Sequence, residues 1–342
     1  MILDFLKNIL KKKPKKYVSC SWIEHGMDFD VGVYGSNLKL CCYLSHKGKG
    51  NAYIKKDYYG EKIDWKNFFK IRNKYRKTQQ KGKTIPECEG CVFLKEGYWD
   101  QEDYIDSIIF DHFTKCNCNC IYCYTTESKK DYNALKSYNV LPTIKEMIKK
   151  DILKPGGAIG FGGGEPTILE EFEDLVSLLL DKGFTNIRVP SSGIKYSKII
   201  EKGISKGQLF VVVSIDSGTK ETYKKIKRTD KYEIVTENLK RYSKAQPSPG
   251  FVISKYILIP NINDTKEEID SWLNFNKENN ILSIVIDIEN SWLEKVMEPE
   301  YKYIFELISY VKEKSEEMGF VRCDICDRAA TVIKEMKSQN LL

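Results

Sequence analysis

Apolar segments of strand length alternate with helical patterns between residues 105 and 290, and this alternation limits the possible folds more than any other feature. The strand-like segments are 107–113, 158–161, 186–189, 209–216, 256–259 and 283–288. The helical patterns are 143–153, 168–182, 195–206, 219–226, 232–244 and 266–279. Strands that alternate with helices predict an α/β fold with a parallel sheet and right-handed crossovers. In barrels of this kind the site lies at the carboxyl ends of the strands, where we expect the functional residues.

Three cysteines follow the first predicted strand in a C-x3-C-x2-C run: Cys116, Cys120 and Cys123. Three thiolates so close together can hold three irons of a [4Fe-4S] cube, whereas a cluster that only carries electrons normally has four cysteine ligands. The fourth iron would be open to bind a small molecule and act on it. A zinc site is the alternative, because these are also zinc-ligand spacings.

This run, with Tyr122 directly before its last cysteine, resembles the signature of the radical S-adenosylmethionine (SAM) enzymes. The resemblance covers residues 105–290 and implies a partial (β/α)6 TIM-like barrel. It also implies that the open iron of the [4Fe-4S] cluster chelates SAM. In that family, electron transfer into the sulfonium of SAM then releases a 5′-deoxyadenosyl radical.

A glycine-rich strand end continues the resemblance. Residues 162–166 read GGGEP and are similar to the family's GGEP motif, which binds the amino group of SAM. Glycines such as Gly163 and Gly164 let a backbone approach a ligand closely, and the carboxylate of Glu165 is an acceptor for an ammonium group. We therefore expect all three residues at the cofactor.

Polar residues at the next strand ends resemble further parts of the family's SAM site. Ser192 lies in a Pro-Ser-Ser-Gly stretch similar to the polar patch near the ribose hydroxyls. The segment that begins at Ser214 resembles the one in which the family uses serine, aspartate and arginine, which implies Ser214, Asp216 and Arg228 as cofactor contacts. The family's usual glycine after the aspartate is Ser217 here.

Five further cysteines precede the predicted barrel and could hold a second site. We expect an auxiliary [4Fe-4S] cluster on Cys20, Cys41 or Cys42, Cys88 and Cys91, which resembles the SPASM or twitch modules of other radical SAM enzymes. In those relatives the module usually follows the barrel. A four-cysteine zinc site remains the alternative.

Three cysteines have no assigned role at this point. Cys323 and Cys326 form a carboxyl-terminal C-x2-C pair that could complete a cluster, bind a second one with other ligands, or do nothing. Cys118 lies inside the cluster loop but off the motif register, which indicates a bystander.

The predicted organisation has four parts. Residues 1–16 form a basic amphipathic segment, 17–104 a cysteine-rich region, 105–290 the core barrel, and 291–342 a helical extension. The first segment could rest on an anionic membrane surface, although a terminal helix docked on the protein is favoured because about ten residues bind a bilayer only weakly.

Composition excludes several classes of protein. The hydrophobic content of 42% and charged content of 30% are ordinary for a globular chain. No apolar stretch is long enough to span a membrane, and no secretory signal is visible, so we expect a cytoplasmic protein. The net charge of +7 comes mostly from scattered lysines, which argues against nucleic-acid binding. Hydrolase, NTPase and dehydrogenase motifs are missing from the sequence.

The predicted activity is hydrogen abstraction from a peptide or small polar substrate, with an external reductant such as flavodoxin or ferredoxin. Asp111, His112, Asp287 and Glu289 lie at strand ends and could reach the cavity, although residues at such positions are as often structural. The competing hypothesis is an iron-sulfur or zinc scaffold that keeps the barrel without cleaving SAM. Substrate and product are left open by the sequence.

Overall fold

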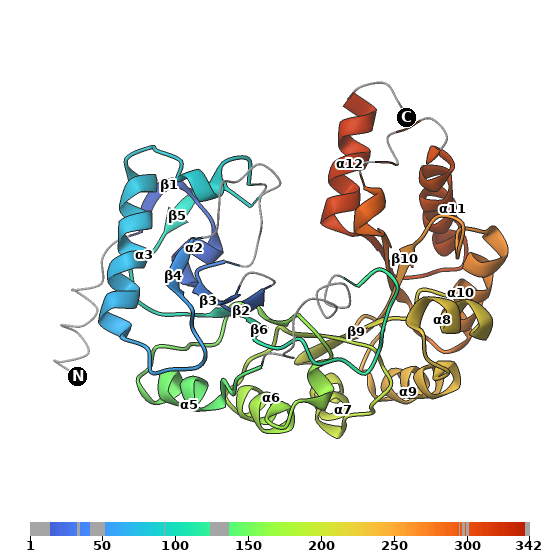
Figure 1. Ribbon diagram of the computed structural model, residues 1–342, viewed down its shortest axis with the longest axis horizontal. Coiled ribbons are helices and arrows are strands. Elements are labelled where there is room, and N and C mark those ends of the chain that lie inside the picture. The colour runs from blue at the N-terminus through green and yellow to red at the C-terminus, as the bar shows by residue number, and fades with distance from the viewer. Residues whose placement is uncertain are drawn as a thin grey trace. The chain divides into compact units, whose positions relative to one another are not determined.

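The computed structural model describes residues 14–32, 35–41, 52–91, 93–123, 137–293, 295, 298 and 301–338. The chain forms two compact units. The first comprises residues 1–114, 135–163 and 181–186, and the second comprises residues 115–134, 164–180 and 187–342. Figure 1 labels the helices and strands for which there is room.

The sheet of the first unit joins strands of the amino-terminal region to the first two strands of the predicted barrel. Its order is β7-β6-β2-β3-β4. The first three of these strands are parallel, and β3 and β4 run antiparallel to their neighbours. The bounds are β2 Gly26–Gly32, β3 Gly35–Lys39, β4 Tyr53–Lys56, β6 Ser107–Asp111 and β7 Ile159–Phe161.

Helices and a two-stranded ladder complete the first unit. The ladder pairs β1 (Lys15–Ser19) with β5 (Lys95–Trp99) in antiparallel orientation. The other elements are α2 Ser21–His25, α3 Trp65–Gln80, the 3-10 turn η1 Pro86–Cys88 and α5 Leu141–Lys149.

The buried side of α3 carries charge as well as apolar side chains. Arg76 lies 3.0 Å from the carboxylate of the buried Glu24, and Arg72 donates to the carbonyl of Tyr104 at 2.8 Å. These contacts fix α3 against α2 and the segment before β6.

The sheet of the second unit is wholly parallel. Its strands neighbour one another in chain order from β8 to β12. The bounds are β8 Ile187–Ser191, β9 Leu209–Ser214, β10 Val252–Leu258, β11 Ser283–Ile288 and β12 Arg322–Ile325. The α-helices of this unit are α6 Phe172–Asp181, α7 Lys198–Ser205, α8 Lys220–Lys227, α9 Tyr232–Ala245, α10 Lys266–Glu278, α11 Tyr303–Glu317 and α12 Asp327–Ser338, and the 3-10 turns are η2 Pro166–Ile168 and η3 Asn290–Trp292.

One face of this parallel sheet lies under helices. On β10, the Trp272 indole of α10 donates to Ser254 at 2.8 Å and packs against Tyr256. Successive strand residues point to opposite faces, so Ile253 and Lys255 lie on the other face, which we call the inner face.

The register of the sheet carries this assignment to the neighbouring strands. Val212 pairs with Ile253 and Ser214 with Lys255, while Val285 pairs with Lys255 across the next ladder. Val212, Ile253 and Val285 form an apolar floor on the inner face. The polar residues follow at the carboxyl ends of the strands, where the sequence predicted them.

The structure confirms the α/β class and all six predicted strands, with a mostly parallel sheet as in the partial barrels of radical SAM enzymes. All six predicted helices are present with shifted ends, and β10 begins at Val252, four residues before the predicted strand. β2 and β12 are additional parallel strands that the sequence analysis did not find. The four predicted region boundaries stay predictions.

Most of the predicted amino-terminal helix lies outside the described residues. Lys15 and Lys16, at the end of the basic tail predicted to follow that helix, begin β1. None of the helices in the described ranges is long and apolar enough to cross a membrane.

Candidate functional site

The loop that carries the C-x3-C-x2-C run is held by the end of α8. The amide of Asn119 donates to the carbonyl of Lys227 at 3.3 Å, and the amide of Ile121 donates to the carbonyl of Ile226 at 3.0 Å. Two backbone contacts thus fix the middle of the run. Its three motif cysteines are partly exposed, as ligands of an open metal centre have to be.

Hydrogen bonding and charge favour the thiolate form of Cys116 and Cys120. The hydrogen bond from Cys118 lowers the pKa of Cys116. The same thiol lowers the pKa of Cys120 to about 6, and the Lys227 ammonium acts in the same direction. The thiolate is the form that binds metals, so the donor set fits an iron-sulfur cluster. Cys118, expected to be a bystander, is buried and hydrogen-bonds to both neighbours.

Tyr122 and Asp216, both predicted at the cofactor, meet at the ammonium of Lys227. Tyr122 donates to the Asp216 carboxylate at 2.6 Å, and Lys227 donates to that carboxylate and, at 2.7 Å, to the Tyr122 hydroxyl. Burial disfavours the Lys227 ammonium, but the carboxylate of Asp216 outweighs it and raises the pKa of Lys227. The sequence analysis missed Lys227, which lies next to the predicted Arg228.

Asp216 also ties this group to β10. Its carboxylate accepts from the amide of Ile257 at 2.8 Å, and its carbonyl accepts from the side chain of Asn263 at 2.8 Å. Asp216 is fully buried and adopts a left-handed conformation with φ of 56°. Its carboxylate is thus held by three donors of the protein.

Glu165 is the centre of a second polar group. Its carboxylate accepts from the Ser191 hydroxyl at 2.9 Å, from the amide of Ser192, and from both the amide and hydroxyl of Thr167. Ser192 in turn donates to the side chain of Asn117 in the cysteine loop at 2.9 Å. Ser192 thus links Glu165 to the cysteine loop.

Ser214 and Arg228 differ in their position and solvent exposure. Ser214 ends β9 on the inner face and is partly exposed. Arg228 caps α8 in a left-handed conformation with φ of 54°, and its side chain is exposed. A residue at this cap position terminates the helix, which is a structural reason for its place.

The predicted close approach at Gly163 is made by the protein itself in the first unit. A Cβ at Gly163, which has φ of +77°, would lie 2.1 Å from the Phe113 carbonyl and 2.9 Å from the Asp111 carboxylate. Glycine is therefore required at this position. Gly164 is partly exposed.

Asp111 belongs to a charged group on the sheet of the first unit. Lys39 lies 3.0 Å from the carboxylate of Asp28 and 3.2 Å from that of Asp30, which pairs with Asp111 across the β2–β6 ladder. Burial raises the pKa of Asp111 to about 8, and the carboxylates of Asp28 and Asp30 contribute. His112 is fully buried beside Phe113. In the second unit, the carboxylate of Glu289 accepts hydrogen bonds from the amide and hydroxyl of Ser291 in the turn after β11.

Four cysteines of the amino-terminal region lie within electrostatic range of one another. Burial raises the pKa of Cys88, and the charges of Cys20, Cys41 and Cys91 add to this effect. Cys20 is buried at the start of α2, and its pKa is raised to about 11. The thiols of Cys20, Cys41 and Cys91 are thus near enough to Cys88 for their charges to affect its pKa, and the shared ligand role stays a prediction. Cys42 lies outside the described residues.

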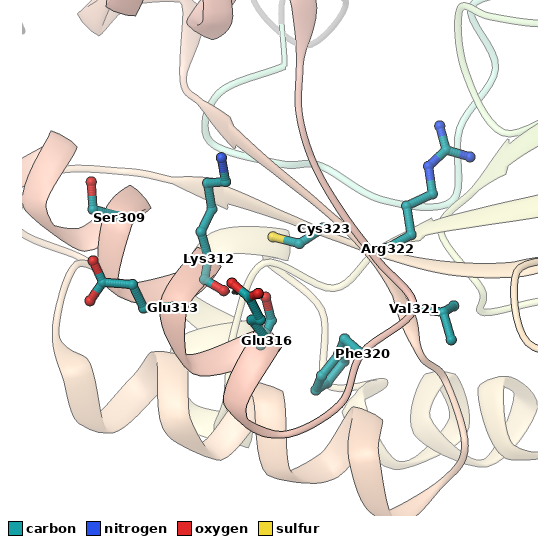
Figure 2. A pocket seen from close by; sticks show the side chains of 9 residues that line it. Ser309, Lys312, Glu313, Glu316, Phe320, Val321, Arg322 and Cys323 are labelled. Atoms are coloured by element: carbon teal, nitrogen blue, oxygen red, sulfur yellow. Dashed lines mark hydrogen bonds between the residues drawn. The ribbon is translucent and has the colours of Figure 1, made fainter.

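The two carboxyl-terminal cysteines lie in different surroundings. Cys323 lines a surface pocket between α11 and β12 with Lys312 and Ser315 (Figure 2). Cys326 instead packs against the apolar floor of the inner face. Cys323 lies on β12 and Cys326 directly follows that strand.

In the described ranges of the chain, no group of three or more His, Cys, Asp or Glu side chains stands at the spacing of a metal-ion site.

The class of the protein follows from comparison with known families. Residues 110–273 match the family model described as "Radical SAM superfamily". The chain therefore contains a radical SAM domain, the domain of a class of enzymes that use a [4Fe-4S] cluster and SAM.

Curated relatives fall within the same class but match only in part. A 7,8-dihydro-6-hydroxymethylpterin dimethyltransferase of Methanocaldococcus jannaschii is 33% identical over 89 residues, which are 26% of this chain and 17% of that protein. A probable GTP 3′,8-cyclase of Saccharolobus islandicus is 23% identical over 201 residues, 58% of this chain and 62% of that protein. The chain thus spans less than two thirds of the length of either relative.

Among solved structures, SuiB of Streptococcus suis bound to S-adenosylmethionine aligns with a TM-score of 0.51 and 12% identity. The alignment covers 75% of this chain and 55% of that one. At this identity the likeness shows the shared fold.

Proposed function

We propose that the protein cleaves SAM reductively at a [4Fe-4S] cluster held by Cys116, Cys120 and Cys123, and abstracts hydrogen from a peptide or small polar substrate. The bound cluster would supply an electron to the sulfonium of SAM, which yields a 5′-deoxyadenosyl radical. An external one-electron reductant such as flavodoxin or ferredoxin would reduce the cluster.

One observation carries this proposal. The cysteine loop is joined by side-chain contacts to Ser192 through Asn117 and to Asp216 through Tyr122. The residues predicted to bind iron and those predicted to bind SAM thus share one polar network within the second unit. A scaffold that only stores iron has no need of such a connection.

The proposed roles toward SAM differ among these residues. Ser192 and Ser214 would contact the cofactor, since Ser214 is partly exposed on the inner face. The buried carboxylate of Glu165 would accept the SAM ammonium in exchange for one of its present donors. Tyr122 and Asp216 would act mainly by positioning the loop, because their polar groups already bind Lys227.

The remaining predicted contacts are Gly163, Gly164 and Arg228. Gly163 and Gly164 would keep the turn before Glu165 free of side chains. Arg228 would reach SAM only from its exposed place at the end of α8.

We also propose an auxiliary [4Fe-4S] cluster on Cys20, Cys41, Cys88 and Cys91. Support comes from Cys88, whose pKa is raised by burial and by the charges of the other three thiols. Replacing Cys20 and Cys88 by alanine should remove about four irons per chain while the SAM-dependent signal remains. Zinc bound in place of the missing iron in wild type would contradict the cluster and leave a zinc site.

The substrate and the compartment are further proposals. The relatives act, by name, on GTP or a pterin, which supports a small polar substrate; a peptide remains the second candidate. Eleven cysteines suit a reducing compartment such as the cytoplasm.

Electron paramagnetic resonance on the reduced, reconstituted protein tests the proposal. SAM that chelates an iron should change the spectrum of the wild-type cluster, and Ser214→Ala should require more SAM for the same change. Ser205→Ala, at the exposed end of α7, is the matched control. A wild-type spectrum indifferent to saturating SAM would support the scaffold hypothesis instead.

A further inference from the structure

A lysine, an aspartate and a cysteine meet on the inner face of the second unit, beyond the residues assigned to SAM. Lys255 on β10 lies 2.7 Å from the carboxylate of Asp287 on β11. The side chains are 20% and 16% exposed, so the pair is largely buried but open to a ligand.

The register of the sheet places Cys326 beside this pair. Ile286 of β11 pairs with Ile325 of β12, and the Cys326 amide donates to the Ile286 carbonyl at 3.0 Å. Cys326 therefore follows β12 in step with Asp287, and its thiol hydrogen-bonds to the Asp287 carboxylate.

The surroundings keep this thiol protonated. Burial raises the pKa of Cys326 to about 11, and the carboxylate of Asp287 adds to the rise against the opposing charge of Lys255. The thiol packs against the apolar floor of Val212, Ile253 and Val285. An S–H group held intact over an apolar surface can give up a hydrogen atom without prior ionisation.

The same face extends to the proposed SAM site. Lys255 pairs with Ser214 across the β9–β10 ladder and interacts electrostatically with Asp216. A substrate lying on this face would thus have the SAM side at β9 and the thiol at β12, two strands beyond Lys255.

We propose that Cys326 is a catalytic residue, the hydrogen-atom donor to a carbon radical of a substrate bound on the inner face. This inference rests on the proposed function. The 5′-deoxyadenosyl radical takes a hydrogen atom from a substrate C–H bond and becomes 5′-deoxyadenosine. The Cys326 S–H bond then breaks, a new substrate C–H bond forms, and a thiyl radical remains.

The thiyl radical returns to the thiol by taking one electron from the low-potential one-electron reductant and one proton from solvent through Asp287. Each turnover therefore uses one SAM and two electrons, while the substrate gains and loses one hydrogen atom. The substrate change is redox-neutral, as in the inversion of a carbon centre.

Isotope transfer tests the donor without knowledge of the substrate. The reconstituted protein is mixed with SAM and dithionite in D2O, and the 5′-deoxyadenosine is analysed by mass spectrometry. The thiol hydrogen exchanges with solvent, so wild type should give product with one carbon-bound deuterium, taken from Cys326 in the absence of substrate. Cys326→Ser and Cys326→Ala should both lose this label.

Cys323→Ser is the matched control, because Cys323 lies on the opposite face of β12 and should leave the label unchanged. Cluster iron content verifies that each variant is folded and loaded. Unlabelled product from wild type, or a label that persists in both Cys326 variants, overturns the inference while the proposed function stands. Absence of any 5′-deoxyadenosine from loaded wild type overturns the proposed function itself.

Discussion

The buried ion pair between Lys227 and Asp216 allows a quantitative test of how the cysteine loop is held. Both side chains are at most 4% exposed, and Lys227→Met removes the cation while keeping most of the side-chain volume. Removing one partner of a buried pair typically costs about 3–5 kcal/mol because the other charge is left uncompensated. Asp216 would keep its contacts with Tyr122 and the amide of Ile257, so we expect the lower end, about 3 kcal/mol.

The assay is urea unfolding of the cluster-free protein, followed by circular dichroism, together with hydrogen exchange of the loop. Lys227→Met should lose about 3 kcal/mol of unfolding free energy and protection at the amides of Asn119 and Ile121. Lys225→Met, on the exposed side of the same helix, is the matched control.

A double-mutant cycle separates the pair from general damage to α8. With Asp216→Asn the uncompensated charge disappears, so the double variant should lose less than the sum of the single losses. Additive losses, or a Lys227→Met protein as stable as Lys225→Met, would refute this explanation of the loop.

Three further outcomes follow from the structure. Glu165→Gln leaves one of the groups that donate to this carboxylate without an acceptor, so it should lower the unfolding free energy by about 2 kcal/mol. It should also weaken SAM binding, as measured by equilibrium dialysis. A variant that binds SAM normally would remove Glu165 from the cofactor site. The folded protein holds the Asp111 proton up to about pH 8, whereas the unfolded chain releases it near the ordinary value of 3.8, so the free energy of unfolding should fall between pH 6 and 8 by about 2 kcal/mol. Thermal unfolding should show this slope in wild type and a flatter one in Asp111→Asn; equal slopes would contradict the assignment. Asp287→Asn should lower the pKa of Cys326 and therefore speed the alkylation of this thiol by iodoacetamide at pH 8 in the cluster-free protein. Peptide mapping measures the alkylation rate. An unchanged rate would place the Asp287 carboxylate away from the thiol.

The parts of the fold that follow from local periodicity could be predicted from the sequence. The apolar run of β9 and the helix pattern after it need only their own residues to be recognised, and both are present. β2 could not be found in this way, because its sequence GMDFDVG places Asp28 and Asp30 on a face whose charge is offset by Lys39 from another strand. A pairing that depends on a distant residue leaves no local pattern.

In the candidate site, too, the residues that form a local sequence pattern could be predicted, and those placed by distant contacts could not. Cys116 and its two partners are identified by spacing alone, since the ligands of one cluster are close in the chain. Lys227 was missed because lysines on an amphipathic helix usually face solvent, and only the packed structure shows its ammonium between Tyr122 and Asp216. The inner-face position of Cys326 likewise depends on the register of β12, a strand too short to be recognised from its sequence.

The central claim is tested most directly by anaerobic assay of 5′-deoxyadenosine formation from SAM with dithionite. Reconstituted wild type should form it, and a triple alanine variant of Cys116, Cys120 and Cys123 should form none while losing about four irons per chain. No 5′-deoxyadenosine from fully loaded wild type, or equal amounts from the triple variant, would contradict the assignment of this loop as the site of SAM cleavage.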